Sequence, residues 1–363
     1  MTPLETEIRR MIAADGPMPL GRFMTLCLAH PVHGYYMSRD PLGVAGDFVT
    51  APEVSQMFGE LVGLWAAAVW QQMGAPRHIR LVELGPGRGT MMSDALRGVR
   101  VLPAFRHALS VDLIEISPVL RRRQEQTLAD LDVPIAWHSD VADLGDGPLI
   151  VIANEFIDAL PVDQLVRTAD GWHARMIGFD AAGGLAFALH PDALLCADSI
   201  VPPQVRDAPI GSVYEWRSGC LITGLAERIV RDGGAGLMID YGHTQPAVGE
   251  TLQSVRSHRP VPVLEDPGDV DLTAHVDFAA LGRAAERAAA RLHGPISQAD
   301  LLRRLGIDAR AARLKTAATY DQAIGIDAAL ARLAGSGPAQ MGGLFKAIAF
   351  APPELGPLPG FDG

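Results

Sequence analysis

The chain changes its hydrophobic pattern near residue 76. Before this point apolar residues recur at helical spacing, which predicts helices from residue 4, over 21–29 and over 55–73. After it, short apolar runs typical of buried strands alternate with stretches of helical pattern. The predicted strands are 79–84, 111–115, 135–138, 149–153 and 236–241, and the predicted helices are 89–97, 118–128 and 220–231. This alternation predicts an α/β fold with a parallel, doubly wound sheet.

Further segments are predicted as additions to this sheet. Short antiparallel strands are expected at 164–168, 172–177 and 185–189, and a last strand is expected at 343–350. Residues 271–334 are rich in Ala, Arg and Leu, which predicts helices interrupted at Gly294-Pro295 and Gly306. The predicted domains are an N-terminal helical segment (1–75), a sheet core with a β-hairpin elaboration near 165–190 (76–258), a mainly helical insertion on the substrate or partner side (259–340), and the last core strand with a tail (341–363).

Charge and composition exclude several classes of protein. The net charge of −11 and the 6% content of aromatic residues argue against nucleic acid or an anionic membrane as the main partner. The start of the chain has no secretory pattern, and the longest apolar run, 61–70, is too short to cross a bilayer of about 30 Å. Three widely spaced cysteines form neither a disulfide framework nor a thiolate metal site. We therefore expect a soluble cytoplasmic protein without a metal, and the oligomeric state is left open.

The segment Glu83-Leu84-Gly85-Pro86-Gly87-Arg88-Gly89-Thr90 lies at a predicted strand-to-helix turn. Glycines at such a turn let a ligand approach the backbone closely. A dinucleotide fingerprint, Gly-x-Gly-x-x-Gly, would need glycine where Thr90 stands. The pattern here instead has an acid, Glu83, two residues before Gly85, which resembles motif I of class I S-adenosyl-L-methionine methyltransferases. S-adenosyl-L-methionine carries a sulfonium and an ammonium group, so a nearby carboxylate suits its charge.

Two more acids follow the next predicted strands. Glu115 ends the second strand, where a carboxylate can accept both ribose hydroxyls of a nucleoside. Asp140 follows the third strand, where methyltransferases often place an acid near the adenine amino group. Each acid alone is explained equally well as a helix cap or a solvated strand end. Three acids at successive strand ends, with the glycine turn, favour a nucleoside cofactor.

The loop after the fourth predicted strand carries Asn154, Glu155 and Asp158. Glu155 and Asp158 suit the planar guanidinium of an arginine, because carboxylates pair with its forked donors. An N-capped helix start with solvated acids explains the same residues nearly as well, so both alternatives stay open. Asn154, a short polar side chain after an apolar run, suits hydrogen bonding to backbone or ligand.

These segments together resemble the MidA and mitochondrial complex I assembly factor family of S-adenosyl-L-methionine-dependent methyltransferases, over nearly the whole chain. The segments that carry the resemblance are His33–Tyr36, Gly46–Glu60, Glu83–Thr90, Glu115–Pro118, Ala153–Gln164, Asp240–His243 and Pro267–Phe278. Residues 259–264 depart from the family pattern, which leaves the conformation of that loop open. The resemblance implies a class I methyltransferase fold with a helical insertion.

The resemblance also implies the activity. It implies symmetric dimethylation of an arginine on the quinone-side core subunit of respiratory complex I, and a bacterial protein would act on its own NADH dehydrogenase subunit. It further implies that Gly46, Asp47, Phe48 and Thr50 fold over the cofactor as a lid. The predicted cofactor residues are Gly46, Asp47, Phe48, Thr50, Glu83, Gly85, Pro86, Gly87, Thr90, Glu115, Ile116, Asp140, Val141 and Asn154.

An arginine nucleophile is cationic at neutral pH, so carboxylates should localise its charge and accept the released proton. We predict Glu155 first and Asp158 second in this catalytic role, with Asp240 and Tyr241 as further candidates. Two alternatives remain: a complex I assembly chaperone that binds S-adenosyl-L-methionine with little catalysis, and an oxidoreductase of Rossmann fold that uses NAD. Thr90 and the lack of a second fingerprint disfavour the oxidoreductase.

Overall fold

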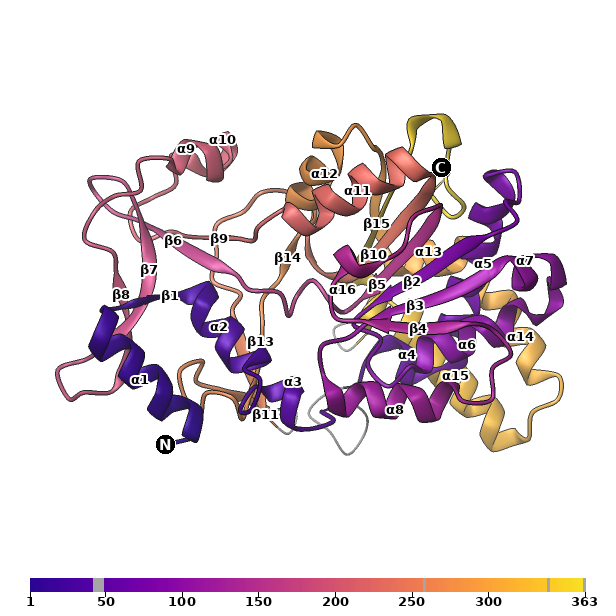
Figure 1. The fold of residues 1–363 in the computed structure, drawn as a ribbon, viewed down its shortest axis with the longest axis horizontal. Coiled ribbons are helices and arrows are strands. Elements are labelled where there is room, and N and C mark those ends of the chain that lie inside the picture. Colours follow the sequence, from indigo (N-terminus) through magenta and orange to yellow (C-terminus); the bar gives the residue numbers. More distant parts are fainter. Residues whose placement is uncertain (42–48, 257–258, 338–339, 362–363) are drawn as a thin grey trace. The chain divides into compact units, whose positions relative to one another are not determined.

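The structure is a computed structural model that describes residues 1–41, 49–256, 259–337 and 340–361 (Figure 1). The predicted lid residues Gly46, Asp47 and Phe48 lie outside the described residues. The chain separates into two compact units, each made of three segments. We call residues 42–157, 219–242 and 280–363 the sheet unit, and residues 1–41, 158–218 and 243–279 the accessory unit.

The sheet unit contains the predicted doubly wound sheet. Its strands are β2 (Ile79–Leu84), β3 (Leu109–Ile114), β4 (Ile135–His138), β5 (Leu149–Asn154), β10 (Gly234–His243), β15 (Arg291–Ser297) and β16 (Phe345–Ala351). They lie in the order β15-β16-β10-β5-β2-β3-β4 (Figure 1). From β4 to β10 neighbouring strands are parallel, and β16 is antiparallel to both β10 and β15. The carboxyl ends of β2, β3, β4 and β5 therefore meet at one edge, as the sequence predicts.

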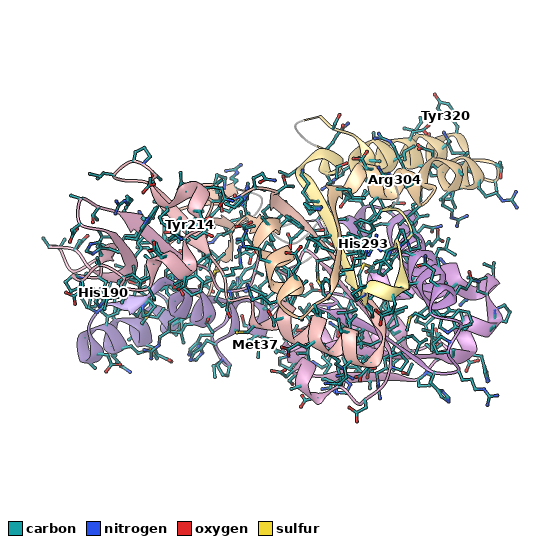
Figure 2. All side chains as sticks on the ribbon, turned by 90° about the horizontal axis from the view of Figure 1, so that it is seen from above. Met37, His190, Tyr214, His293, Arg304 and Tyr320 are labelled. Atoms are coloured by element: carbon teal, nitrogen blue, oxygen red, sulfur yellow. The ribbon has the colours of Figure 1, made fainter. Side chains whose placement is uncertain are left out.

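Helices of the sheet unit cover the sheet. They are α4 (Ala51–Val54), α5 (Gln56–Gln72), α6 (Thr90–Gly98), α7 (Pro103–Ala108), α8 (Pro118–Leu128), α11 (Cys220–Asp232), α13 (Gln298–Arg304), α14 (Ile307–Lys315), α15 (Tyr320–Ala334) and α16 (Met341–Leu344), with α12 (Phe278–Arg287) crossing into this unit. Side chains that alternate along the strands form one core with α5 and α6, in which Trp65, Leu81 and Ile152 are buried. Tyr320, the first residue of α15, is exposed and points outward (Figure 2).

The α5 helix shows how the sequence fixes this packing. The hydroxyl of Ser55 accepts a hydrogen bond from the Met57 backbone N–H and caps the helix start. Gly59 and Gly63, one turn apart, face α6: a Cβ added at Gly63 would lie 2.6 Å from the carbonyl oxygen of Ala95. The two helices therefore approach more closely than any side chain at these positions allows.

One prediction for this part of the chain is wrong. Residues 291–297 are expected to be helical, interrupted at Gly294-Pro295, but they form β15, the edge strand paired with β16. The register shifts between His293 (labelled in Figure 2) and Ile296, so Gly294-Pro295 marks an irregularity inside a strand. Pairing with β16 outweighs the helical tendency of the surrounding composition.

The accessory unit combines helices with antiparallel strands. Its elements are α1 (Pro3–Asp15), β1 (Met18–Pro19), α2 (Leu20–Ala29), α3 (Tyr35–Ser38), β6 (Asp163–Arg167), β7 (Trp172–Phe179), β8 (Leu185–Leu189), α9 (Ala197–Ile200), α10 (Pro203–Arg206), β9 (Val213–Trp216), β11 (Gln253–Arg256), β12 (Arg259–Val261), β13 (Asp271–Thr273) and β14 (Val276–Asp277). The predicted antiparallel strands are confirmed as β6, β7 and β8. Residues 271–273 and 276–277, expected to be helical, are short strands. Leu165, Trp172 and Tyr214 (the last labelled in Figure 2) lie in the core of this unit.

The loop that departs from the family pattern, 259–264, begins with β12, which pairs with β11. Within the described ranges, no helix combines the length and the apolar character needed to cross a membrane.

Candidate cofactor site

The turn between β2 and α6 requires its glycines. Gly85, Gly87 and Gly89 have φ of 60°, 53° and 80°, in the left-handed region that favours glycine. A Cβ added at Gly85 would lie 2.6 Å from Cδ2 of Phe156. The glycine turn thus lies directly after β2, at the edge where β2, β3 and β5 end, as the motif predicts.

Two predicted acids are buried beside this turn. Glu83, the fifth residue of β2, is 2% exposed, and Glu115, directly after β3, is 8% exposed. Burial, together with the charge of Glu115, raises the pKa of Glu83 to about 8. Burial also raises the pKa of Glu115. Hydrogen bonds from the Ser117 backbone, from Gln124 and from the Ile116 backbone act in the opposite direction and lower this pKa.

The environment of Glu83 indicates a ligand. Its Oε2 is buried and accepts no hydrogen bond from the residues that the structure describes, and the same holds for Oδ1 of Asn154, the last residue of β5. Glu83 pairs with Ile152 in register, so Glu83 and Asn154 project from the same face of the sheet. Buried polar oxygens without partners are costly, so their retention favours a ligand that donates hydrogen bonds here. The ammonium group of S-adenosyl-L-methionine meets this requirement, and the Glu115 carboxylate suits a ribose.

Sequence reasoning missed one residue of this site, Gln124 on α8. Its Nε2 donates to the carbonyl oxygen of Gly87 at 2.7 Å and to Oε2 of Glu115 at 3.0 Å. Its Oε1 accepts a hydrogen bond from Nε1 of Trp137 at 3.0 Å. The available signal was a polar residue in an apolar stripe: Gln124 is buried between Leu120 and Leu128, at helical spacing.

Several other predicted cofactor residues have local roles. Asp140 is exposed and its Oδ1 accepts a hydrogen bond from the Ala142 backbone at 2.8 Å, so it caps the short 3-10 turn η2 (Val141–Asp143). The hydroxyl of Thr90 donates to Oε1 of Glu53 on α4 at 2.5 Å. Pro86 is buried in the turn, whereas the Ile116 side chain is 50% exposed. Thr50 directly precedes α4. Their contacts with a cofactor stay predictions.

The loop after β5 is held in an unusual backbone conformation. Glu155 has φ of 49°, a left-handed conformation that a residue other than glycine adopts at a cost in free energy. Its Oε1 accepts hydrogen bonds from the Ala51 backbone at 2.8 Å and from Nδ2 of Asn154 at 3.1 Å. The buried carboxylate of Asp240 accepts a hydrogen bond from the Ile157 backbone at 3.0 Å. No helix begins here in the described chain, so the alternative of an N-capped helix start is wrong.

Asp158 belongs to the accessory unit and is 6% exposed. Its carbonyl oxygen accepts hydrogen bonds from Nη2 of Arg217 at 3.0 Å and from the Ala274 backbone at 3.1 Å. Burial raises the pKa of Tyr36, and the charges of Asp271 and Asp158 raise it further. The Tyr36 hydroxyl donates to Oδ1 of Asp271 at 2.9 Å. Asp158 and Asp271 are both buried and their charges both act on Tyr36, whereas the pairing of Asp158 with Glu155 around one guanidinium stays a prediction.

Comparison with known proteins identifies a family. Residues 61–296 match a family of S-adenosyl-L-methionine-dependent methyltransferases. A curated relative named protein arginine methyltransferase NDUFAF7, mitochondrial, from Xenopus tropicalis is 39% identical over 327 residues, which cover 82% of this chain and 74% of the relative. The protein of the same name from Homo sapiens is 36% identical over 338 residues, covering 85% and 75%. The Drosophila melanogaster homolog is 35% identical over 380 residues, covering 97% and 85%.

Two solved structures from Burkholderia thailandensis share the fold. One is bound to S-adenosyl-homocysteine and superposes with a TM-score of 0.83 at 29% identity, covering 99% of this chain and 92% of that chain. The other, a native structure, has a TM-score of 0.80 at 28% identity with the same coverage. These relatives favour the methyltransferase interpretation of the glycine turn over the dinucleotide oxidoreductase.

Proposed function

Because this chain belongs to the family of S-adenosyl-L-methionine-dependent methyltransferases, we propose that it methylates an arginine side chain of a protein. The buried Glu83 oxygen beside the glycine turn, which accepts no hydrogen bond from the described part of the chain, carries the cofactor part of this proposal. The names of relatives that are 35–39% identical support arginine as the acceptor. The number of methyl groups transferred follows from the resemblance alone, which points to symmetric dimethylation.

Each part of the cofactor has a matching side chain. S-adenosyl-L-methionine supplies a methyl group made electrophilic by the sulfonium to which it is bound. Glu83 and Asn154 accept hydrogen bonds from the cationic amino group, and Glu115 accepts them from the ribose hydroxyls. This leaves the charge of two neighbouring carboxylates partly offset by the cation, which lowers the cost of their burial.

Glu155 serves the arginine. A guanidinium is charged at neutral pH and is a poor nucleophile, so a carboxylate must orient it and take its proton as the new bond forms. The hydrogen bonds from the Ala51 and Asn154 donors fix the Glu155 carboxylate before the substrate arrives. Asp158 is the second candidate for this role, by the resemblance.

The proposed substrate is the quinone-side core subunit of the organism's own NADH dehydrogenase, during its assembly. The family resemblance supports this choice, whereas the names of the relatives state only arginine methylation and a mitochondrial location. The cytoplasmic location expected from the sequence stays a prediction.

Mass spectrometry of that subunit tests the proposal. We expect a methylated arginine in wild-type cells, its loss when the gene is deleted, and its return with the wild-type protein. Glu155→Gln should not restore it, although the purified variant should bind S-adenosyl-homocysteine within about twofold of wild type, because the amide oxygen still accepts hydrogen bonds from Ala51 and Asn154. Glu227→Gln, which changes an exposed acid on α11, is the matched control and should restore methylation fully.

Other outcomes would overturn parts of the proposal. An unmodified subunit in wild-type cells, or unchanged methylation after deletion, contradicts the proposed substrate. Loss of S-adenosyl-homocysteine binding in Glu155→Gln contradicts the role given to Glu155. Restored complex assembly by Glu155→Gln without methylation would instead favour the assembly chaperone.

A further inference from the structure

Gln124 uses every hydrogen-bonding group of its side chain. The side chain is fully buried (0% exposed), and its three partners come from three different elements: the turn after β2, the residue after β3, and β4. Two of these partners, Gly87 and Glu115, are predicted cofactor residues. The third is the indole N–H of Trp137.

The partners determine how the amide is oriented. The Gly87 carbonyl and the Glu115 carboxylate only accept hydrogen bonds, and the Trp137 indole only donates one. One orientation of the amide satisfies all three, with Nε2 toward Gly87 and Glu115 and Oε1 toward Trp137. The opposite orientation would set an amide oxygen against two acceptors, so the side chain is locked.

Helix packing alone does not call for a glutamine here. Gln124 lies one turn from both Leu120 and Leu128, and all three side chains are buried. A leucine or methionine would continue the apolar stripe of α8 at less cost, because a buried amide is stabilising only when it is fully bonded. The presence of an amide here is therefore explained by the groups to which it is hydrogen-bonded.

Two of the bonded groups, the Gly87 carbonyl and the Glu115 carboxylate, belong to the proposed cofactor site. Oε1 of Glu115 accepts a hydrogen bond from the Ser117 backbone at 2.7 Å, while Oε2 accepts one from Gln124. The carboxylate is therefore fixed in rotation before any ligand arrives. The bond from Gln124 to the Gly87 carbonyl ties the glycine turn to the same amide.

We infer that Gln124 is a positioning residue for the cofactor: its amide holds the Gly87 turn and the Glu115 carboxylate in one fixed arrangement that recognises the ribose hydroxyls. This inference rests on the proposed contact between Glu115 and the ribose. Gln124 acts through Glu115 and Gly87, and the benefit is preorganisation, since neither group has to be ordered when the ligand binds.

The experiment measures how strongly the protein prefers a ribose that has its hydroxyls. Adenosine and 2′,3′-dideoxyadenosine compete against S-adenosyl-homocysteine, and the ratio of their dissociation constants is the readout. We expect wild type to prefer adenosine by about tenfold or more, as for hydrogen bonds to a charged group. Gln124→Met should weaken the binding of S-adenosyl-homocysteine by about tenfold. It should also reduce the preference for adenosine over 2′,3′-dideoxyadenosine to less than about threefold.

A matched control separates positioning from packing. Gln298, on α13, is equally buried and donates to the Leu333 carbonyl at 2.9 Å. Gln298→Met removes this single hydrogen bond from an equally buried amide and should keep the preference for adenosine, whatever its effect on the thermal midpoint. If Gln124→Met does not fold, Gln124→Leu, which matches Leu120 and Leu128 on the same stripe and also lacks both N–H donors, takes its place with the same expectation.

The measured preferences test the inference and its premise separately. Wild-type preference retained in the folded Gln124 variant overturns the inference, as does an equal loss in Gln124→Met and Gln298→Met. Glu115→Gln separately tests the premise: if that variant keeps the preference, the ribose contact of Glu115 is wrong, and the proposed function loses that contact whatever the Gln124 variants show.

Discussion

At the scale of single residues, Glu83 combines burial, a neighbouring negative charge and an oxygen without a partner among the described residues. Its pKa of about 8 means that the ligand-free protein holds this carboxyl mostly protonated at pH 7. A cationic amino group beside it favours the ionised form and lowers this pKa. Ligand binding should therefore be linked to proton release.

This linkage gives a pH prediction. The affinity for S-adenosyl-homocysteine should increase as pH rises from about 6 to about 8, and binding at about pH 7 should release a proton. Isothermal titration calorimetry in two buffers of different ionisation enthalpy counts that proton. Glu83→Gln should abolish the release and weaken binding by about tenfold or more. A wild-type affinity that is constant over this range contradicts the assignment of Glu83.

The same group affects the stability of the ligand-free protein. Because the folded-state pKa of Glu83 lies above its ordinary value of 4.5, folding favours its protonated form. The stability associated with this group is complete below the ordinary value and is lost as pH rises through about 8. The Glu83→Gln protein should therefore lose less stability than wild type over this range.

Residue-level prediction relied on patterns that lie close together in the sequence. Glu83 was identified because it lies two residues before Gly85, and Glu115 because it ends a recognisable strand. Gln124 was missed because its partners lie on three other elements, and sequence spacing does not show which of them a side chain of α8 contacts. The left-handed backbone conformation of Glu155 could not be predicted either. Glu155 contacts Ala51 and Ile239, which are far from it in the sequence, and no sequence pattern indicates those contacts.

At the scale of elements, the contact between α5 and α6 depends on small residues. Both helices were predicted from periodicity, but periodicity does not show how closely they approach. The space facing Gly63 is occupied by the α6 backbone at Ala95, so even a methyl group has no room. This contact holds the helix that begins directly after the glycine turn.

Gly63→Ala should therefore lower the free energy of unfolding by about 1–3 kcal/mol, because added volume in a packed contact forces the helices apart. Gly224→Ala is the matched control: this glycine is exposed within α11 and has nothing within 4 Å of an added Cβ. That substitution should raise the free energy by about 0.5–1 kcal/mol, through the helix preference for alanine. Urea unfolding followed by circular dichroism measures both. The close packing would be disproved by two changes of the same sign.

Strand β15 shows the limit of prediction for elements. Interior strands such as β5 have continuous apolar runs, because both of their faces are covered. An edge strand lacks this signal, and β15 contains a glycine, a proline and an exposed arginine. Its identity as a strand comes from pairing with β16, which is more than 40 residues away in the sequence.

At the scale of the whole molecule, the sheet was predictable and the division into units was harder to see. The chain passes between the two units after residues 41, 157, 218, 242 and 279. The hydrophobic pattern changes near residue 76, away from these points, because it reports local periodicity and not which segments pack together. The four consecutive segments expected from the sequence stay a prediction about domains.

The proposed cofactor contacts argued from the structure lie in the sheet unit, at the end of β2, the end of β3, α8 and the end of β5. Residues from distant parts of the chain thus meet because parallel strands end at one edge. We therefore expect the nucleoside of the ligand to lie across the ends of β2 and β3, with the amino group of the ligand at Glu83.

A crystal structure of the protein with S-adenosyl-homocysteine tests this claim most directly. We predict the ribose hydroxyls within hydrogen-bonding distance of Glu115, the amino group beside Glu83 and Asn154, and the ligand against the Gly85–Gly87 backbone. A ligand bound elsewhere, or side chains of the protein filling the space beside Gly87, would contradict it.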